Sequence, residues 1–310
     1  MSATFPLITT SEDRATIRYE LVGEPGAPVV AVLGGISSSR HVTSSPNNPH
    51  PGWWDAVVGP GRAIDTRKFR VISIDYVTAG ARDVTTTDQA DVLAVALDSA
   101  AVETLHAVVG ASYGGMVALA FGAKYPTRTR RLIAIGAAHR SDPRTTALRL
   151  LQRRIVALGR STGRERDGLA IARGIAITSY VTPRHFVEEL ESTQNDDSAA
   201  VVDRIEDYLA SRGEAFAGSW TSERYNALSL SLDLHNVRPE DVKPPTTVIA
   251  VSSDRLVPLD DCRELALRLG GPSQLIELDS PYGHDAFLGD PDRIAGFIQE
   301  LLAIGREVRS

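Results

Sequence analysis

The sequence predicts an α/β protein in which helices cover both faces of a mostly parallel sheet. Short β-rich runs alternate with helical runs in the first half of the chain, and the same alternation returns near the C-terminus. A long, purely helical stretch separates these two parts. Strands that alternate with helices are typical of a parallel sheet with helices on each side.

Each expected element follows from the spacing of its apolar residues. The expected strands are Ala15–Val22, Pro28–Leu33, Phe69–Tyr76, His106–Ala111, Arg131–Ala137, Thr246–Ser252 and Gln274–Leu278. The expected helices between them are Thr87–Ala100, Tyr113–Tyr125, Asp260–Leu269 and Pro291–Ile304.

The middle of the chain has amphipathic helical patterns and no convincing strand. Helices are expected there at Leu148–Leu158, Gly168–Tyr180, Pro183–Leu190 and Ala199–Arg212. We therefore expect residues 1–140 and 235–310 to form one core and residues 141–234 to form a helical lid. Such a lid would cover the C-terminal edge of the sheet, where folds of this class bind ligands.

Composition and charge argue against several classes of protein. The formal net charge is -6, so no basic surface for nucleic acid is expected. The N-terminus lacks the features of a secretory signal, and no apolar run is long enough to cross a membrane. The single cysteine, Cys262, permits no internal disulfide, and its helical context favours a small buried hydrophobic residue over a nucleophile. These features together predict a protein of the reducing cytoplasm.

The strongest local motif is Gly110-Ala111-Ser112-Tyr113-Gly114, which matches G-x-S-x-G. It follows a predicted strand and begins a predicted helix, the context in which this motif forms a nucleophile elbow. The helix N-terminus there favours developing negative charge. Ser112 is therefore the expected nucleophile of an α/β-hydrolase fold.

A serine hydroxyl needs a base, and in this fold the chain order is serine, acid, histidine. His284 lies in a loop after the last predicted strand and is the expected base. Asp254 follows the preceding strand and is the expected acid, which would fix the tautomer of His284. Asp260 and Asp261 are competitors, although carboxylates at these positions also suit the first turn of a helix.

The oxyanion hole of such an enzyme needs two backbone N–H groups. One is expected from Tyr113, directly after the nucleophile. The other is expected from Ile36, in the Gly-Gly-Ile loop that follows the strand Pro28–Leu33.

Beyond the elbow, the sequence resembles the homoserine O-acyltransferases of methionine biosynthesis over most of its length. These enzymes transfer an acyl group from a CoA thioester to the hydroxyl of homoserine. The matching segments include Gly52-Trp53-Trp54-Asp55, Gly114-Gly115-Met116, Gly168-Leu169-Ala170-Ile171-Ala172-Arg173, Thr178-Ser179-Tyr180 and the stretch from Tyr225 to Asp233.

The resemblance implies roles for two residues outside the triad. Arg173 falls on the lid arginine of the family, which binds the carboxylate of the amino acid, and Asp285 falls on its contact to the ammonium. It also implies a ping-pong mechanism through an acyl-serine, acyl-CoA and L-homoserine as the substrates, a homodimer, and neither a metal nor a cofactor.

The identity of the acyl donor depends on fewer residues. Succinyl-CoA carries a carboxylate that acetyl-CoA lacks, so a succinyl enzyme needs a cation near the acyl group. Arg255, next to Asp254, is the expected cation, with Arg40 as a second candidate, and the loop Leu33–Val42 resembles the succinyl-using branch. Acetyl-CoA as donor, L-serine as acceptor, and a plain esterase or thioesterase remain alternatives, because Tyr113 and the stretch from Trp220 to Tyr225 depart from the family pattern.

Overall fold

A seven-stranded sheet forms the centre of the computed structural model, which describes residues 17–78, 83–191 and 198–303. The strand order is β1-β5-β2-β6-β7-β8-β9; β1 is antiparallel to β5, and every other neighbouring pair is parallel. The strands are β1 (Tyr19–Gly23), β2 (Val29–Leu33), β5 (Arg70–Ile74), β6 (Ala107–Ala111), β7 (Leu132–Ile135), β8 (Thr246–Val251) and β9 (Ser273–Leu278). The predicted fold class, an α/β-hydrolase fold with a mostly parallel sheet, is confirmed.

Successive residues of the central strands pack into two different apolar layers. On β6, Val108 packs in the same cluster as α1 (Thr86–Ser99) and α2 (Tyr113–Lys124), whereas Val109 packs with α10 (Pro291–Ala303). α8 (Leu259–Arg268) joins α2 on the first of these faces. Because side chains alternate across a strand and both faces are covered, β2, β6 and β7 carry no polar side chain at any position.

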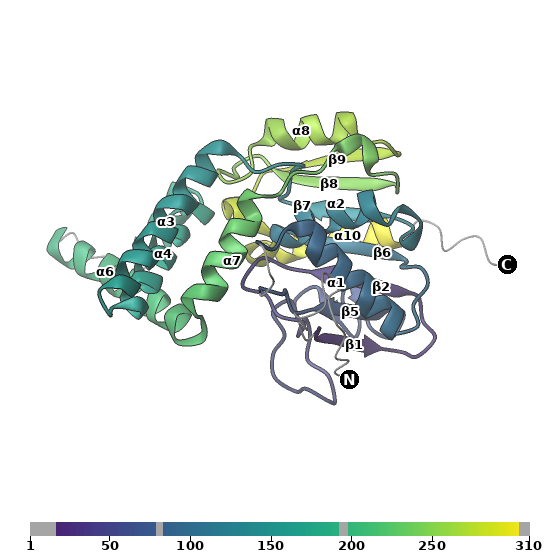
Figure 1. Ribbon diagram of the computed structural model, residues 1–310, viewed down its shortest axis with the longest axis horizontal. Coiled ribbons are helices and arrows are strands. Elements are labelled where there is room, and N and C mark those ends of the chain that lie inside the picture. Colours follow the sequence, from purple (N-terminus) through teal and green to yellow (C-terminus); the bar gives the residue numbers. More distant parts are fainter. Residues whose placement is uncertain (1–16, 79–82, 192–197, 304–310) are drawn as a thin grey trace.

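Between β7 and β8 the chain leaves the sheet and forms the helical insertion. Its described part consists of α3 (Pro143–Ser161), α4 (Glu165–Tyr180), α5 (Pro183–Glu191), α6 (Ser198–Ser219) and α7 (Ser222–Asp233). In Figure 1, α3, α4 and α6 lie together beside the sheet, and α7 runs between them and the core. A Cβ on Gly168 would lie 3.0 Å from the carbonyl oxygen of Ile155, so a residue without a side chain allows α4 to approach α3 closely.

Two features differ from the elements expected from the sequence. α7 is a separate helix that the apolar pattern does not single out, although Thr221 caps it by accepting the N–H of Arg224 at 3.2 Å. A short parallel pair, β3 (Val58–Gly59) and β4 (Ile64–Asp65), was also not expected, because two-residue strands have no measurable periodicity. The remaining short elements are η1 (Pro126–Arg128), η2 (Pro239–Asp241), η3 (Gly283–Asp285) and α9 (Ala286–Gly289).

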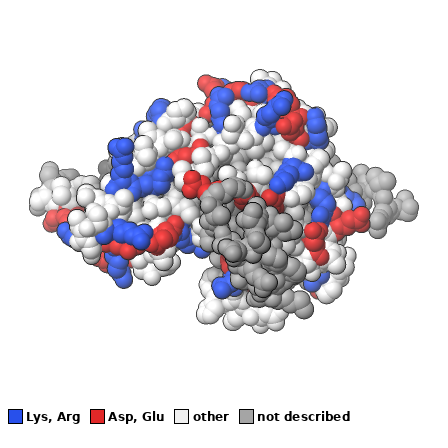
Figure 2. Space-filling model, viewed as in Figure 1, with Lys and Arg blue, Asp and Glu red and all other residues white. Residues whose placement is uncertain are grey.

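The visible surface mixes both signs of charge. Figure 2 shows basic and acidic side chains side by side over the core; on and around α8, Arg263 pairs with Glu277 at 2.7 Å and Arg268 with Glu240 at 2.9 Å. Among the described residues, no helix is long and apolar enough to cross a membrane.

Candidate active site

Ser112 lies at the sharp turn between β6 and α2, and its backbone is strained. Its φ of 54° is unusual for a residue with a side chain and costs about 1–3 kcal/mol. The flanking glycines permit the turn, since a Cβ on Gly110 would lie 2.2 Å from the carbonyl oxygen of Gly114. A Cβ on Gly114 would in turn lie 2.2 Å from the carbonyl oxygen of Leu33. The motif therefore makes the elbow possible by removing side chains where backbones meet.

The structure brings Ser112, His284 and Asp254 into one hydrogen-bonded chain. The Ser112 Oγ lies 2.7 Å from Nε2 of His284, and Nδ1 of His284 lies 2.7 Å from Oδ2 of Asp254. The other carboxylate oxygen of Asp254 accepts the N–H groups of Leu256 and Val257 at 2.8 and 3.0 Å. This arrangement suits a base whose tautomer and orientation are set by a fixed carboxylate. The competing carboxylates, at positions 260 and 261, lie in the first turn of α8.

The environment of His284 balances two opposed effects on its pKa. Burial alone lowers the pKa, but the charge and hydrogen bond of Asp254, together with the charge of Asp285, raise it above the usual histidine value. A base with a raised pKa binds the serine proton more strongly, provided that the solution pH keeps it neutral beforehand.

The two predicted oxyanion donors are Tyr113, which directly follows the nucleophile, and Ile36, which lines the same pocket as the nucleophile. The N–H of Tyr113 occupies the first position of α2, where a helix leaves its N–H groups without intrahelical partners. Ile36 and Gly35 line the same pocket as Ser112, and a Cβ on Gly35 would lie 4.0 Å from the Cβ of Ser112. Among the described residues, neither N–H has a hydrogen-bond acceptor, so both are available to an oxyanion.

The side chain of Tyr113 faces away from the pocket and links the elbow to the insertion. It is fully buried, and its hydroxyl lies 2.6 Å from the Oγ of Ser231 on α7. Burial raises the pKa of the Tyr113 hydroxyl well above its usual range. The helical insertion is thus anchored directly next to the nucleophile.

The pocket lies between the C-terminal ends of the strands and the insertion, and the structure brings Arg173 and Asp285 into it. The guanidinium of Arg173 lies 5.4 Å from the ring centres of both Tyr180 and Phe216. Burial raises the pKa of Asp285, and the positive charges of His284 and Arg173 oppose the rise. One cation and one carboxylate thus lie in the same pocket as the nucleophile.

The structure does not bring Arg255 or Arg40 to this pocket. Arg255 is exposed, whereas the next residues, Leu256 and Val257, line the pocket, so the turn after Asp254 directs the Arg255 side chain to solvent. Arg40 forms an ion pair with Asp75 and does not line the pocket either. Neither arginine is thus among the residues that line the pocket, and a role for either at the acyl group stays a prediction.

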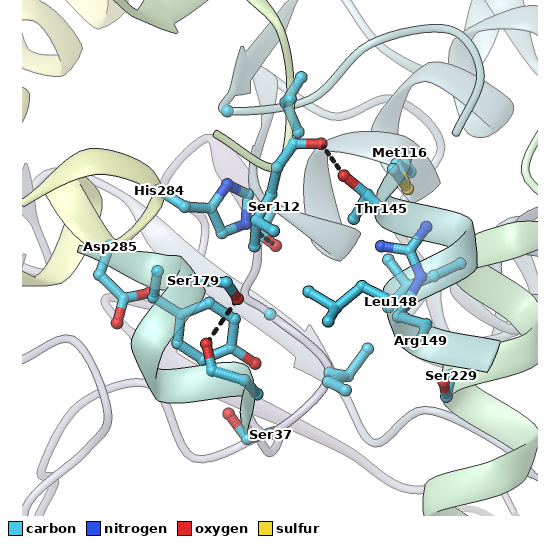
Figure 3. Close-up of a pocket in the computed structure, with 18 of the residues that line it drawn as sticks. Ser37, Ser112, Met116, Thr145, Leu148, Arg149, Ser179, Ser229, His284 and Asp285 are labelled. Carbon is cyan, nitrogen blue, oxygen red and sulfur yellow. Dashed lines mark hydrogen bonds between the residues drawn. The ribbon is translucent and has the colours of Figure 1, made fainter. Parts of the chain in front are cut away.

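Sequence reasoning missed a further arginine that lines the pocket, Arg149 of α3. Its Nε lies 2.6 Å from Asp233 of α7, and Nη2 of Arg153 lies 2.6 Å from the same carboxylate. Arg153 also donates to Ser229 at 2.8 Å. In Figure 3, Arg149 and Asp285 lie on opposite sides of the pair formed by Ser112 and His284. Arg149 and Arg153 are four residues apart on a predicted helix and therefore lie on the same face of it. That spacing was the signal in the sequence that could have identified this pair of cations.

Two arginines therefore share a single carboxylate. The two guanidinium groups therefore carry one more positive charge than Asp233 balances, and the side chains concerned are only 7–14% exposed; two other carboxylates, Asp142 and Asp261, also line the pocket. Buried excess charge is costly unless a ligand of opposite sign binds there. The arrangement suits an anionic group of a substrate.

Cys262 does not line the pocket. It is 1% exposed, and burial raises the pKa of its thiol to about 12. Within the described residues, no three side chains of His, Cys, Asp or Glu are grouped so that they could hold a metal ion.

Comparison with known proteins assigns the family. A family model described as the alpha/beta hydrolase fold matches residues 45–291. The homoserine O-succinyltransferase of Xanthomonas campestris pv. campestris is 42% identical, over 96% of this chain and 81% of that protein. The serine O-succinyltransferase of Litchfieldella anticariensis is 33% identical, over 93% of this chain and 92% of that protein.

Solved structures share the fold. The homoserine O-acetyltransferase from Staphylococcus aureus superposes with a TM-score of 0.84 at 20% identity, covering 100% of this chain and 96% of that one. Esterase E22 superposes with a TM-score of 0.85 at 24% identity, covering 96% of this chain and 97% of that one. The fold, the elbow and these relatives together show that the chain belongs to the α/β-hydrolase fold family and, within it, to the homoserine O-acyltransferases.

Proposed function

We propose that the chain transfers a succinyl group from succinyl-CoA to the hydroxyl of L-homoserine. The observation that supports this most is one pocket containing a Ser–His–Asp chain, a cation and carboxylate for an amino acid, and a second, uncompensated cation. The relatives that are succinyltransferases of homoserine and of serine support the same reaction class.

In the first half-reaction, Ser112 is acylated. Its Oγ attacks the thioester carbonyl while His284 takes the hydroxyl proton, and the N–H groups of Tyr113 and Ile36 stabilise the oxyanion. The C–S bond then breaks, and the CoA thiolate takes the proton from His284 as it leaves. The product is an ester between the succinyl group and Ser112.

In the second half-reaction, homoserine replaces CoA. Arg173 binds its carboxylate in bidentate fashion and Asp285 binds its ammonium, which places its hydroxyl near His284. His284 removes the hydroxyl proton, the oxygen attacks the acyl ester, and the proton returns to Ser112 as the ester bond breaks. A plain esterase or thioesterase has no need of such a pair for a zwitterion.

The choice of succinyl over acetyl follows from the charge near Arg149. A succinyl chain ends in a carboxylate, which would neutralise the positive charge that Asp233 leaves unbalanced between Arg149 and Arg153. An acetyl group carries no charge that could pair with Arg149. Arg149 therefore takes the role that was expected of Arg255.

A thiol-release assay tests the proposal. Purified protein receives succinyl-CoA or acetyl-CoA, each with homoserine, serine or no acceptor, and Ser112→Ala serves as the inactive control. We expect the fastest release with succinyl-CoA and homoserine. Release that does not depend on an acceptor would identify a thioesterase, faster release with acetyl-CoA would identify an acetyltransferase, and faster release with serine would identify a serine acyltransferase.

Assembly and location belong to the same proposal. We expect a homodimer of the cytoplasm that needs no cofactor beyond its CoA substrate. Light scattering of the purified protein tests the dimer, and a monomer at micromolar concentration would contradict it. To test whether a cofactor is needed, the protein is treated exhaustively with chelator and passed through gel filtration, and we expect it to keep full activity.

A further inference from the structure

The peptide unit between Gly35 and Ile36 determines where one oxyanion donor points. In a trans peptide the N–H and the C=O point in opposite directions, so the orientation of the Gly35 carbonyl fixes that of the Ile36 N–H. Gly34 and Gly35 are consecutive glycines, which restrict the backbone less than any other residues. Without further contacts, this peptide could rotate and direct a carbonyl oxygen towards the developing oxyanion.

The side chain of Ser38 holds the Gly35 carbonyl. Its Oγ donates to the Gly35 oxygen at 2.7 Å, and its backbone N–H donates to the same oxygen at 3.0 Å. Ser38 is 8% exposed, so water competes weakly for this carbonyl. Two donors on the carbonyl side hold this peptide unit and keep the Ile36 N–H on its opposite side.

The preceding carbonyl, that of Gly34, is held in the same way. The Tyr76 hydroxyl donates to the Gly34 oxygen at 2.7 Å, and the N–H of Gly114 in the elbow donates to it at 2.9 Å. Tyr76 is 3% exposed, and its ring packs edge-on against Tyr113 with the ring centres 4.8 Å apart. These contacts tie the glycine loop to the same elbow that presents the nucleophile.

We propose that Ser38, assisted by Tyr76, is a positioning residue that holds the Ile36 N–H in the oxyanion hole. The proposal rests on acyl transfer through Ser112 but not on the identity of donor or acceptor. Ser38 lines the pocket, but its hydroxyl donates to the Gly35 carbonyl as that of Tyr76 does to Gly34, so each hydroxyl acts through the backbone carbonyl that it binds. The glycines permit the close approach of loop and elbow, and the two hydroxyls remove the freedom that the glycines introduce.

Ser38→Ala is the direct test. Removal of a whole oxyanion donor lowers kcat about 100- to 1,000-fold in other enzymes. Since the alanine variant keeps the Ile36 N–H and loses only its fixed orientation, we expect a smaller loss, about 10- to 100-fold in kcat. KM for the acyl donor should change little. The bond lost in this variant orients a donor to the oxyanion, which forms only in the transition state, and does not serve to bind the substrate in its ground state.

Two further variants separate positioning from a general effect on folding. Ser38→Thr keeps the hydroxyl and should restore most of kcat, whereas Ser39→Ala removes an exposed neighbouring hydroxyl and should leave kcat unchanged. Tyr76→Phe keeps the ring and removes the hydroxyl that binds the Gly34 carbonyl and adjoins the Ser38 side chain, so it should lower kcat with KM unchanged. If Ser38→Ala does not fold, the kcat of Tyr76→Phe tests the positioning role in its place.

Hydrolysis of p-nitrophenyl acetate keeps this test independent of the proposed substrates. The reaction forms the same oxyanion, so Ser38→Ala should slow it by a factor similar to that for thiol release from the CoA thioester. If neither homoserine nor serine accepts an acyl group but ester hydrolysis still falls in Ser38→Ala, the proposed acceptor is wrong and the positioning role stands. If Ser38→Ala lowers the melting temperature and leaves kcat of both reactions unchanged, the positioning role is refuted.

Discussion

Replacing Arg149 by Gln should convert a preference for succinyl-CoA into near indifference between succinyl-CoA and acetyl-CoA. Among the described residues, the Arg149 guanidinium donates to Asp233 and Ser141, which leaves Nη1 for a ligand. One charge-assisted hydrogen bond to a carboxylate contributes about 1.5–3 kcal/mol. At about 1.4 kcal/mol for each factor of ten, kcat/KM for succinyl-CoA should fall about 10- to 150-fold.

The fold should survive this change, because Asp233 keeps its ion pair with Arg153 and no buried carboxylate loses its last partner. The assay compares kcat/KM for thiol release from succinyl-CoA and acetyl-CoA at a saturating concentration of homoserine. Arg255→Gln is the matched control and should leave the ratio unchanged. The reasoning is refuted if Arg149→Gln keeps the succinyl preference or if Arg255→Gln loses it.

Three other predictions follow from the site and the core. Asp285→Asn should lower the raised pKa of His284, because it removes a negative charge that raises it. Only neutral His284 accepts the serine proton, so the acid limb of the pH profile of kcat/KM for the acyl donor should move to lower pH. An unchanged acid limb would contradict this. Gly283→Ala should lower the free energy of unfolding by at least about 1 kcal/mol in urea titrations, since φ is +54° and a Cβ would lie 2.5 Å from the carbonyl oxygen of Tyr180; an unchanged midpoint would show that this turn relaxes freely. Iodoacetamide should not inactivate the native protein, because Cys262 is buried and burial raises its pKa to about 12; labelling of the folded protein with loss of activity would show otherwise.

Much of the site was accessible from the sequence because its residues stand next to strong local patterns. Ser112 lies inside a five-residue motif between an apolar strand and an apolar helix, and the structure places it at that turn. Asp254 and His284 follow two consecutive strands, and parallel strands bring their C-terminal ends to one edge of a sheet. Chain order and strand position were therefore enough to predict that these three residues meet.

The arginines show where such reasoning ends. Arg255 adjoins the catalytic aspartate in sequence, yet consecutive side chains in a turn point in different directions, and this one points to solvent. Arg149 lies 37 positions after the nucleophile in a helix whose pattern shows only that it is amphipathic. Which of its charged residues enters the pocket depends on how α3 packs against α7, and Asp233 of α7 decides it by binding Arg149 and Arg153.

The sequence by itself determined the strands of the main sheet, most of the helices, the elbow, the chain order of the triad and the family, because each depends on local pattern or on residues matched one by one. Only the tertiary structure decided that Arg149 lines the pocket and Arg255 does not, and which hydroxyls bind the carbonyls of the glycine loop. Ser38 lies three residues from the carbonyl that it binds, but Tyr76 lies 42 residues from Gly34. Such contacts join a side chain of one element to the backbone of another, so the periodicity of apolar residues in the sequence does not predict them.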